Sequence, residues 1–171
     1  MESKASLDAV RGVRFGLVST PTVATRGIMQ LWAARRRGNA PPRRDSFTTD
    51  DLARWAGGLL IVDETGATPR VEVYSPSLAL AIGAEIAGLP LPEWPTWIQM
   101  MGMRTSARLR GASLPFLERV QRPASGGVRL YDRLVLPLAD RRGHNVGWLG
   151  FIDNRRDVLS APPPPDAPPP T

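Results

Sequence analysis

The sequence has no cysteine, and His144 is the only histidine among its 171 residues. The lack of cysteine excludes disulfides, thiolate metal sites, cysteine nucleophiles and flavin–cysteine photochemistry. One histidine provides no pair for a histidine-based metal site, and no nucleophile-elbow pattern accompanies it. A phosphate-binding glycine loop is also missing, because neither Gly57-Gly58 nor Gly126-Gly127 has the required spacing and following lysine. We therefore expect that the chain is not an enzyme and that it holds no metal.

Lysine is almost absent as well, since the 22 basic residues are Lys4 and 21 arginines. The net charge is +6 and the isoelectric point about 11.1, values that bring nucleic acid or an anionic membrane into consideration as a partner. A strong preference for arginine, together with many alanine, glycine and proline residues, is also typical of a GC-rich genome. The charge alone therefore does not identify a nucleic-acid partner, and such a partner remains the second interpretation.

Long apolar runs are the third absence. None approaches the roughly 20 residues of a membrane-spanning helix, and the amino terminus has no signal-peptide core, so we expect a cytoplasmic protein. The length is typical of one domain with tails. We expect an N-terminal arm over residues 1–21, a domain over 22–157 and a disordered proline-rich tail over 158–171.

Helical spacing and capping signals predict four helices. They cover residues 22–37, 48–55, 77–82 and 95–109. Alternation and β-branched runs predict five strands, over residues 59–63, 69–74, 114–120, 130–136 and 146–152. The last two strands read as a hairpin around Asp140-Arg141-Arg142-Gly143. This order predicts an α+β fold, a five-stranded antiparallel sheet with helices on one face and an N-terminal helix.

The order of elements and several local motifs resemble the PAS domain superfamily. The resemblance is to a branch of stand-alone bacterial PAS proteins in which an N-terminal tryptophan helix precedes an Arg-Gly turn and a Pro-x-Arg-x-Asp segment. The matching residues here are Trp32, Arg37-Gly38 and Pro42-Arg43-Arg44-Asp45. The resemblance spans about residues 25–153 and implies the same five-stranded sheet.

The resemblance also implies a function. PAS proteins of this branch are sensory or interaction modules that bind a small ligand or a partner protein. With no output domain in the sequence, we expect signalling in trans, to a partner protein or within a homodimer. Haem-binding PAS domains carry their histidine on a helix, whereas His144 lies in an expected turn, so we expect neither haem nor flavin. An unidentified small apolar or amphipathic molecule fits better.

The predicted helix over residues 95–109 corresponds to the helix that lines the ligand pocket in PAS domains. Its tryptophan and methionine side chains form a soft, adaptable wall, although plain core packing is the alternative. The candidate ligand contacts on this helix and on the strand over residues 130–136 are Trp97, Ile98, Met100, Met101 and Val135.

Two further sets are candidates for contacts with partners. The outer sheet face and the tryptophan helix often form dimer or partner contacts in PAS domains. The candidates there are Ile28, Leu31, Trp32 and Trp148. Guanidinium groups match phosphate oxygens, and the candidate anion contacts are Arg36, Arg37, Arg43 and Arg44. In the structural alternative, Asp45 pairs with one arginine and the others end a helix in solvent.

Overall fold

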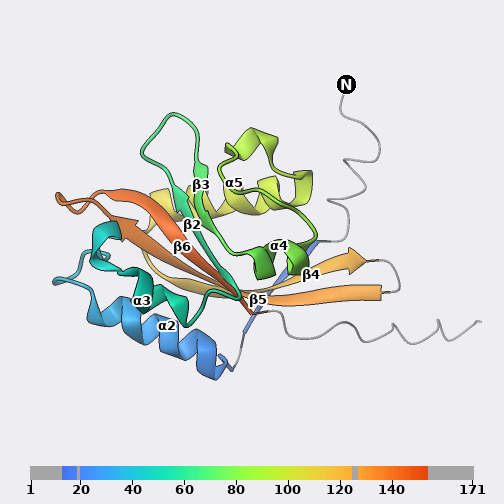
Figure 1. Cartoon of the computed structure of the whole chain (residues 1–171), viewed down its shortest axis with the longest axis horizontal. Coiled ribbons are helices and arrows are strands. Elements are labelled where there is room, and N and C mark those ends of the chain that lie inside the picture. The colour runs from blue at the N-terminus through green and yellow to red at the C-terminus, as the bar shows by residue number, and fades with distance from the viewer. Residues whose placement is uncertain (1–12, 19, 125–126, 154–171) are drawn as a thin grey trace, which may run out of the picture.

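One antiparallel sheet forms the centre of the computed structural model, which describes residues 13–18, 20–124 and 127–153 (Figure 1). Its strands run in the order β1-β4-β5-β6-β2-β3. They are β1 (Arg14–Leu17), β2 (Leu59–Asp63), β3 (Arg70–Tyr74), β4 (Phe116–Ala124), β5 (Gly127–Ala139) and β6 (Asn145–Asp153). The five predicted strands are all present, and β5 and β6 form the expected hairpin.

The sixth strand, β1, corrects the prediction of five. It lies within the residues assigned to an N-terminal arm and pairs with β4 at the sheet edge, where Phe15 lies opposite Val120. Phe15 is partly buried against the core. Four residues are too few for a strand signal, and this strand exists because β4 provides a partner about a hundred residues away. Residues 1–12 and the proline-rich tail lie outside the described residues.

Six helical segments connect the strands. They are α2 (Val23–Ala34), η1 (Arg44–Ser46), α3 (Thr49–Ala53), α4 (Pro76–Ile82), η2 (Leu91–Glu93) and α5 (Thr96–Gly111). The four predicted helices are confirmed, and Thr48 and Asp51 form a reciprocal capping box at the start of α3. Helix α2 ends at Ala34, before the expected end, and Arg37 instead forms a β-bridge with Ala40 across a tight turn at Gly38, whose φ is 63°.

The helices cover both faces of the sheet, which corrects the prediction of a single covered face (Figure 1). Helices α2 and α3 pack on one face against the side chains of Leu59, Ile61 and Leu134. Helices α4 and α5 pack on the opposite face against Leu60, Val62 and others. Because side chains alternate along a strand, every central strand supplies residues to two cores. Among the described residues, no helix is long and apolar enough to span a membrane.

Candidate functional site

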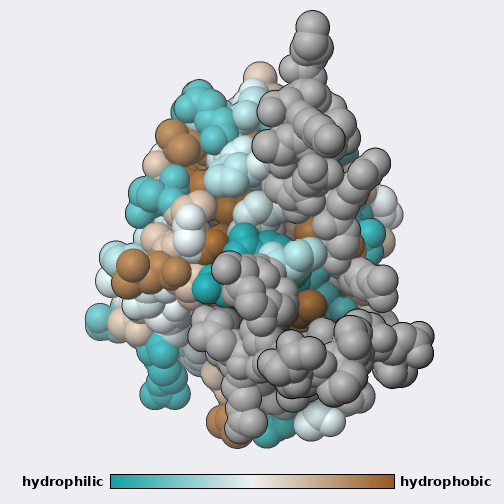
Figure 2. Space-filling model, turned by 90° about the vertical axis from the view of Figure 1, so that its right-hand side faces the viewer, coloured by the Kyte–Doolittle hydropathy of each residue, from teal (hydrophilic) through white to brown (hydrophobic). Residues whose placement is uncertain are grey.

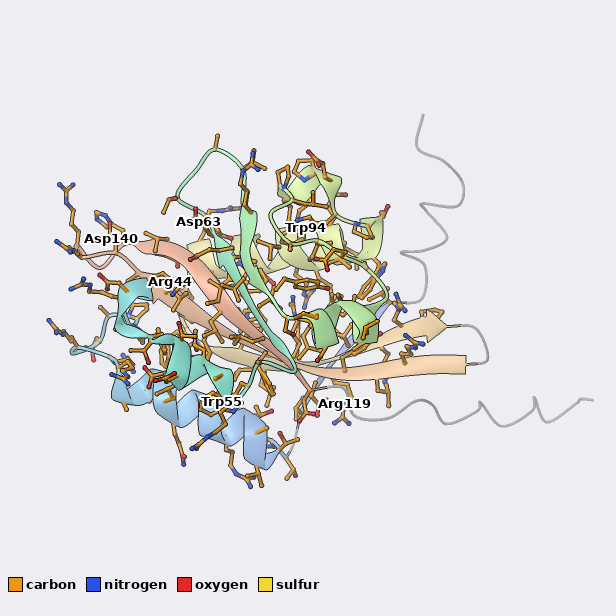
Figure 3. The ribbon with its side chains drawn as sticks, viewed as in Figure 1. Arg44, Trp55, Asp63, Trp94, Arg119 and Asp140 are labelled. Atoms are coloured by element: carbon orange, nitrogen blue, oxygen red, sulfur yellow. The ribbon has the colours of Figure 1, made fainter. Side chains whose placement is uncertain are left out.

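The core between α5 and the sheet contains the candidate ligand-binding residues, and we call it the α5 core. Trp97, Ile98 and Met101 of α5 point into it, and all three are buried. They face strands β5 and β6. Trp94 lies on the same side of the sheet as α5 (Figure 3). Three of the candidate ligand contacts predicted from the sequence therefore lie between α5 and the sheet.

Two small cavities remain in the α5 core. The first has a volume of about 10 Å³ and is lined in part by Trp97, Tyr131 and Arg133. The second, of about 20 Å³, lies between Trp94, Ile98 and Arg133. A cavity of roughly 10–15 Å³ holds one water molecule, whereas small-molecule sites enclose roughly 300–1,000 Å³. Side chains of the protein itself thus fill most of this interior.

A buried ion pair lies beside these cavities. Arg133 of β5 and Glu118 of β4 are directly opposite one another in the sheet, and they are 3% and 5% exposed. The guanidinium donates from Nε and Nη2 to Oε1 of Glu118, the Nε distance being 3.1 Å. Burial lowers the pKa of Arg133, and the opposing charge of Glu118 offsets part of that effect.

A second ion pair lies at the neighbouring position and on the opposite face. Arg119 donates to both carboxylate oxygens of Asp132, at 2.7 Å and 3.0 Å, and the two residues are register partners. This hydrogen bond raises the pKa of Arg119. Two successive cross-strand positions therefore carry ion pairs: in the first the arginine is on β5, and in the second it is on β4.

The hydroxyl of Tyr131 is the unusual polar group of the α5 core. Its ring stacks on Trp97 with centroids 6.4 Å apart and an interplanar angle of 12°. The residue is buried and lines the smaller cavity. Among the described residues the hydroxyl has no hydrogen-bond partner. Buried polar groups are nearly always paired, so this hydroxyl is an exception in the α5 core.

The other candidate ligand contacts lie near this place but outside the cavities. Val135 is fully buried in the α5 core, and Met100 is partly exposed on α5. Neither lines either cavity. Tyr131 and Arg133, which do line them, were not selected from the sequence. Side chains alternate along a strand, so Tyr131 and Arg133 lie on the same face as Val135. This alternation in the sequence could have identified them.

The candidate partner contacts are mostly buried within the chain. Ile28 and Trp32 face the sheet from α2, and Leu31 is only partly exposed. Trp148 is 3% exposed, and its indole N–H donates to Glu64 at 3.2 Å on the α5 side. The expectation that Trp148 lies on an outer surface is therefore wrong, because helices cover both faces of β6. Helix α2 itself occupies the sheet face that was expected to meet a partner.

A groove rich in arginine lies at the end of the β5–β6 hairpin, and we call it the arginine groove. Its volume is about 490 Å³. It is lined by Arg35, Arg37, Ala40, Pro41, Pro42, Arg43, Asp45, Ser46, Asp140, Arg141, Arg142 and Gly143. Figure 3 shows Arg44 and Asp140 at the same end of the molecule. The fold thus brings a turn about a hundred residues away to the arginine segment found in the sequence.

Most arginines of that segment have partners. Arg35 binds both carboxylate oxygens of Asp51, at 2.7 Å and 2.8 Å. Arg44 binds Glu72 through two nitrogens, with Nη2 at 2.6 Å from one carboxylate oxygen and Nε at 3.0 Å from the other.

The remaining partners are local. Arg43 pairs with Asp45, as the structural alternative expected, and Arg36 donates to the carbonyl of Asn39 at 2.8 Å. Of the candidate anion contacts, Arg37 and Arg43 line the groove.

Arg141 and Arg142 were not among the candidates, although the sequence placed them in a turn. Asp140 holds that turn by accepting from the backbone N–H groups of Arg142 at 2.7 Å and of His144 at 2.9 Å. These two hydrogen bonds, that of His144 first, lower the pKa of Asp140. His144 is 73% exposed, as expected for a turn residue. In the described part of the chain, no cluster of three acids or histidines is arranged to hold a metal ion.

Comparisons with known proteins give structural similarity only. No protein-family model matches the chain, and no match appears among curated proteins. Similar solved structures include PAS and light-oxygen-voltage domains. The PAS domain of Bordetella pertussis BvgS is 18% identical with a TM-score of 0.48, over 59% of this chain and 79% of that one.

Two photoreceptor structures are similar to the same degree. A fungal light-oxygen-voltage photoreceptor is 17% identical with a TM-score of 0.44, over 78% of this chain and 92% of that one. A light-oxygen-voltage domain studied with a flavin analogue is 13% identical with a TM-score of 0.46, over 63% and 84%.

Proposed function

We propose that this chain is a stand-alone PAS-type sensory module that binds a compact polar molecule in the α5 core and signals in trans. The observation that carries the proposal is the unpaired, buried hydroxyl of Tyr131 beside the Arg133–Glu118 pair. A plain hydrophobic core gains nothing from an unpaired hydroxyl, which costs roughly 1–3 kcal/mol. A ligand with a hydrogen-bond acceptor would remove that cost.

The size of the cavities limits the ligand. The spaces of about 10 Å³ and 20 Å³ do not fit a flavin or a haem with the side chains as they lie. The chain also has no cysteine for an adduct with flavin. A ligand of a few heavy atoms fits if Met101 or Trp97 moves, and methionine adapts readily to such a change. We propose no catalytic step for the chain itself.

Signalling in trans is part of the proposal. In it, a second molecule reads the response of the described domain, which consists of one sheet and its covering helices. We propose a homodimer or a separate partner protein in this role. In its coloured part, the face in Figure 2 carries hydrophobic residues scattered among polar ones. The partly exposed Leu31 on α2 stays a candidate contact.

Native and denaturing mass spectrometry of protein purified from cells tests the ligand. The wild type is expected to carry a small extra mass under native conditions that is lost on denaturation. In Tyr131→Phe most of that extra mass should be lost, because the variant has no hydroxyl to donate a hydrogen bond to the ligand. The native spectrum also reports whether the protein is a dimer.

Tyr74→Phe is the matched comparison, because Tyr74 is the other tyrosine of the chain and its hydroxyl already donates to the carbonyl of Ala84 at 3.0 Å. Tyr74 lines the second cavity but not the first one, which Tyr131 lines. This variant should keep the extra mass. A wild-type protein without any extra mass, or equal occupancy in wild type and Tyr131→Phe, would contradict the proposed ligand site.

A further inference from the structure

We propose that the arginine groove binds phosphate groups of a ligand that carries at least two phosphates in succession. Pyrophosphate-containing small molecules and the backbone of a nucleic acid share this chemistry. The groove is separate from the α5 core, and its lining residues come from the loop after α2 and from the β5–β6 turn. The proposal therefore does not depend on the ligand proposed above.

Charge is concentrated in this groove and not in the hollow next to it. Five arginines and two aspartates line the groove, which leaves three positive charges. The neighbouring hollow of about 300 Å³ shares Arg43 and Arg141 with the groove. It is lined by three arginines and four carboxylates, so its net charge is negative. An anion is thus attracted to one of two adjoining spaces, which a general excess of surface arginine does not explain.

Three guanidinium groups in the groove are available for a ligand. Among the described residues, the side chains of Arg37, Arg141 and Arg142 form no hydrogen bond or ion pair. The guanidinium charge of Arg141 acts on Asp45, and that of Arg142 on Asp140, without a side-chain hydrogen bond. Arg37 comes from the loop after α2, whereas Arg141 and Arg142 come from the β5–β6 turn. A ligand with two phosphates can therefore meet a guanidinium on each wall.

Both walls of the groove are held in place by the backbone. The N–H of Ala139 donates to the carbonyl of Pro42 at 2.9 Å and joins the loop to β5. Arg43 and Ala139 form a β-bridge at the same point. Asp140 fixes the turn that carries Arg141 and Arg142 through its two backbone hydrogen bonds. A site with fixed walls loses less entropy when it binds a ligand.

The lining also indicates the kind of ligand. No aromatic residue is among those that line the groove, and its apolar part consists of Ala40, Pro41 and Pro42. A base or an acyl chain therefore has little surface on which to stack or pack. Arginine forks match phosphate oxygens in two-pronged geometry, so the groove recognises phosphate and not the group attached to it.

Binding of two probes across a range of salt concentrations tests the proposal. The probes are inorganic pyrophosphate, followed by calorimetry, and a fluorescent 20-nucleotide oligo-dT, followed by anisotropy. The double variant Arg141→Ala/Arg142→Ala should weaken binding by about tenfold or more. With the oligonucleotide, loss of two phosphate contacts should reduce the slope of log K against log salt by about 1.4. Arg37→Ala should weaken binding from the other wall.

The control is Arg54→Ala/Arg110→Ala, which removes the same charge from two exposed arginines outside the groove. It should bind like the wild type. Pyrophosphate that binds and displaces the oligonucleotide identifies a small-molecule site, whereas an oligonucleotide that binds without such competition identifies the nucleic-acid backbone. If both double variants weaken binding equally, or if neither probe binds the wild type at about 0.15 M salt, the proposal is wrong.

Discussion

The indole Nε1 of Trp32 donates a hydrogen bond of 2.8 Å to the carbonyl oxygen of Pro137, 105 residues later in the chain. Pro137 lies in β5, a central strand of the sheet, where a proline is normally excluded because it cannot donate to a neighbouring strand. Here β4 begins at Phe116, opposite Val135. Pro137 therefore lies past the end of β4 and has no partner residue on that strand. Trp32 donates to this buried carbonyl and joins α2 to the sheet.

Trp32→Phe should reduce the free energy of unfolding by about 1–3 kcal/mol, because the Pro137 carbonyl stays buried without a donor and the smaller ring leaves a gap. Urea unfolding followed by circular dichroism measures this change.

Trp55→Phe is the control for that experiment, because Trp55 packs at the edge of the same core and its indole N–H makes no hydrogen bond to a described residue. Its loss of stability should be smaller. Equal losses in the two variants would show that the hydrogen bond to Pro137 adds nothing beyond packing.

Tyr131→Phe should stabilise protein that has been refolded from denaturant and so freed of small molecules. Removal of an unpaired buried hydroxyl recovers roughly 1 kcal/mol of its desolvation cost. Tyr74→Phe should instead lose about 1 kcal/mol, since it breaks the hydrogen bond to Ala84. Paired urea titrations at neutral pH measure both values. A destabilised Tyr131→Phe variant would show that the hydroxyl has a partner in the free protein.

Glu118→Gln should destabilise the protein strongly, by about 3–5 kcal/mol, because Arg133 then keeps its charge in a buried site without a counter-charge. The double variant Glu118→Leu/Arg133→Met replaces the pair with apolar groups of similar size and should recover most of the loss. Unfolding in guanidinium or urea measures the free energy of unfolding of the wild type, the single variant and the double variant. A double variant as unstable as Glu118→Gln would assign the loss to side-chain shape and not to charge.

Acid should destabilise the protein in part through Asp51. The carboxylate of Asp51 accepts from the backbone N–H of Thr48, at 3.0 Å, and from Arg35, and the Thr48 hydrogen bond is the main cause that lowers the pKa of Asp51 below its ordinary value of 3.8. A carboxylate with a lowered pKa in the folded state stabilises the fold above its unfolded pKa, and this contribution is lost as the pH falls through the folded pKa.

Asp51→Asn keeps an acceptor for Thr48 but no longer titrates. Its stability should therefore fall less than that of the wild type between about pH 5 and about pH 3. Asp50→Asn, on the adjacent first-turn acid, is the control and should follow the wild type. Thermal unfolding at several pH values measures the difference, and parallel curves for all three proteins would rule out the role of Asp51.

Much of the fold could be predicted because its signals are local. The buried strand over residues 59–63 matches β2 in both bounds, and the capping residues at Thr48 mark the start of α3. Trp148 and Phe151 are an odd number of residues apart on β6, and they accordingly lie in the two different cores. Alternation does not show whether helices cover a given face of the sheet. For that reason the prediction of a surface position for Trp148 was wrong.

The two candidate sites could be predicted only in part, because each joins residues that are distant in the sequence. Arg141 and Arg142 read as turn residues, and the pairing of Ala139 with the Pro42-Arg43 segment brings that turn beside the loop of Arg37. The burial of Arg133 depends in the same way on Glu118, which the pairing of β4 with β5 places opposite it. A single sequence contains no signal for that pairing.

The two ion pairs between β4 and β5 also protect the alignment of these strands. Glu118 lies opposite Arg133, and Arg119 lies opposite Asp132. A slip of one residue in one direction would bring Glu118 opposite Asp132, and a slip in the other direction would bring Arg119 opposite Arg133. Both misaligned hairpins would therefore oppose like charges while turning every side chain to the wrong face. We expect this arrangement to exclude shifted pairings from the earliest stage at which the hairpin forms.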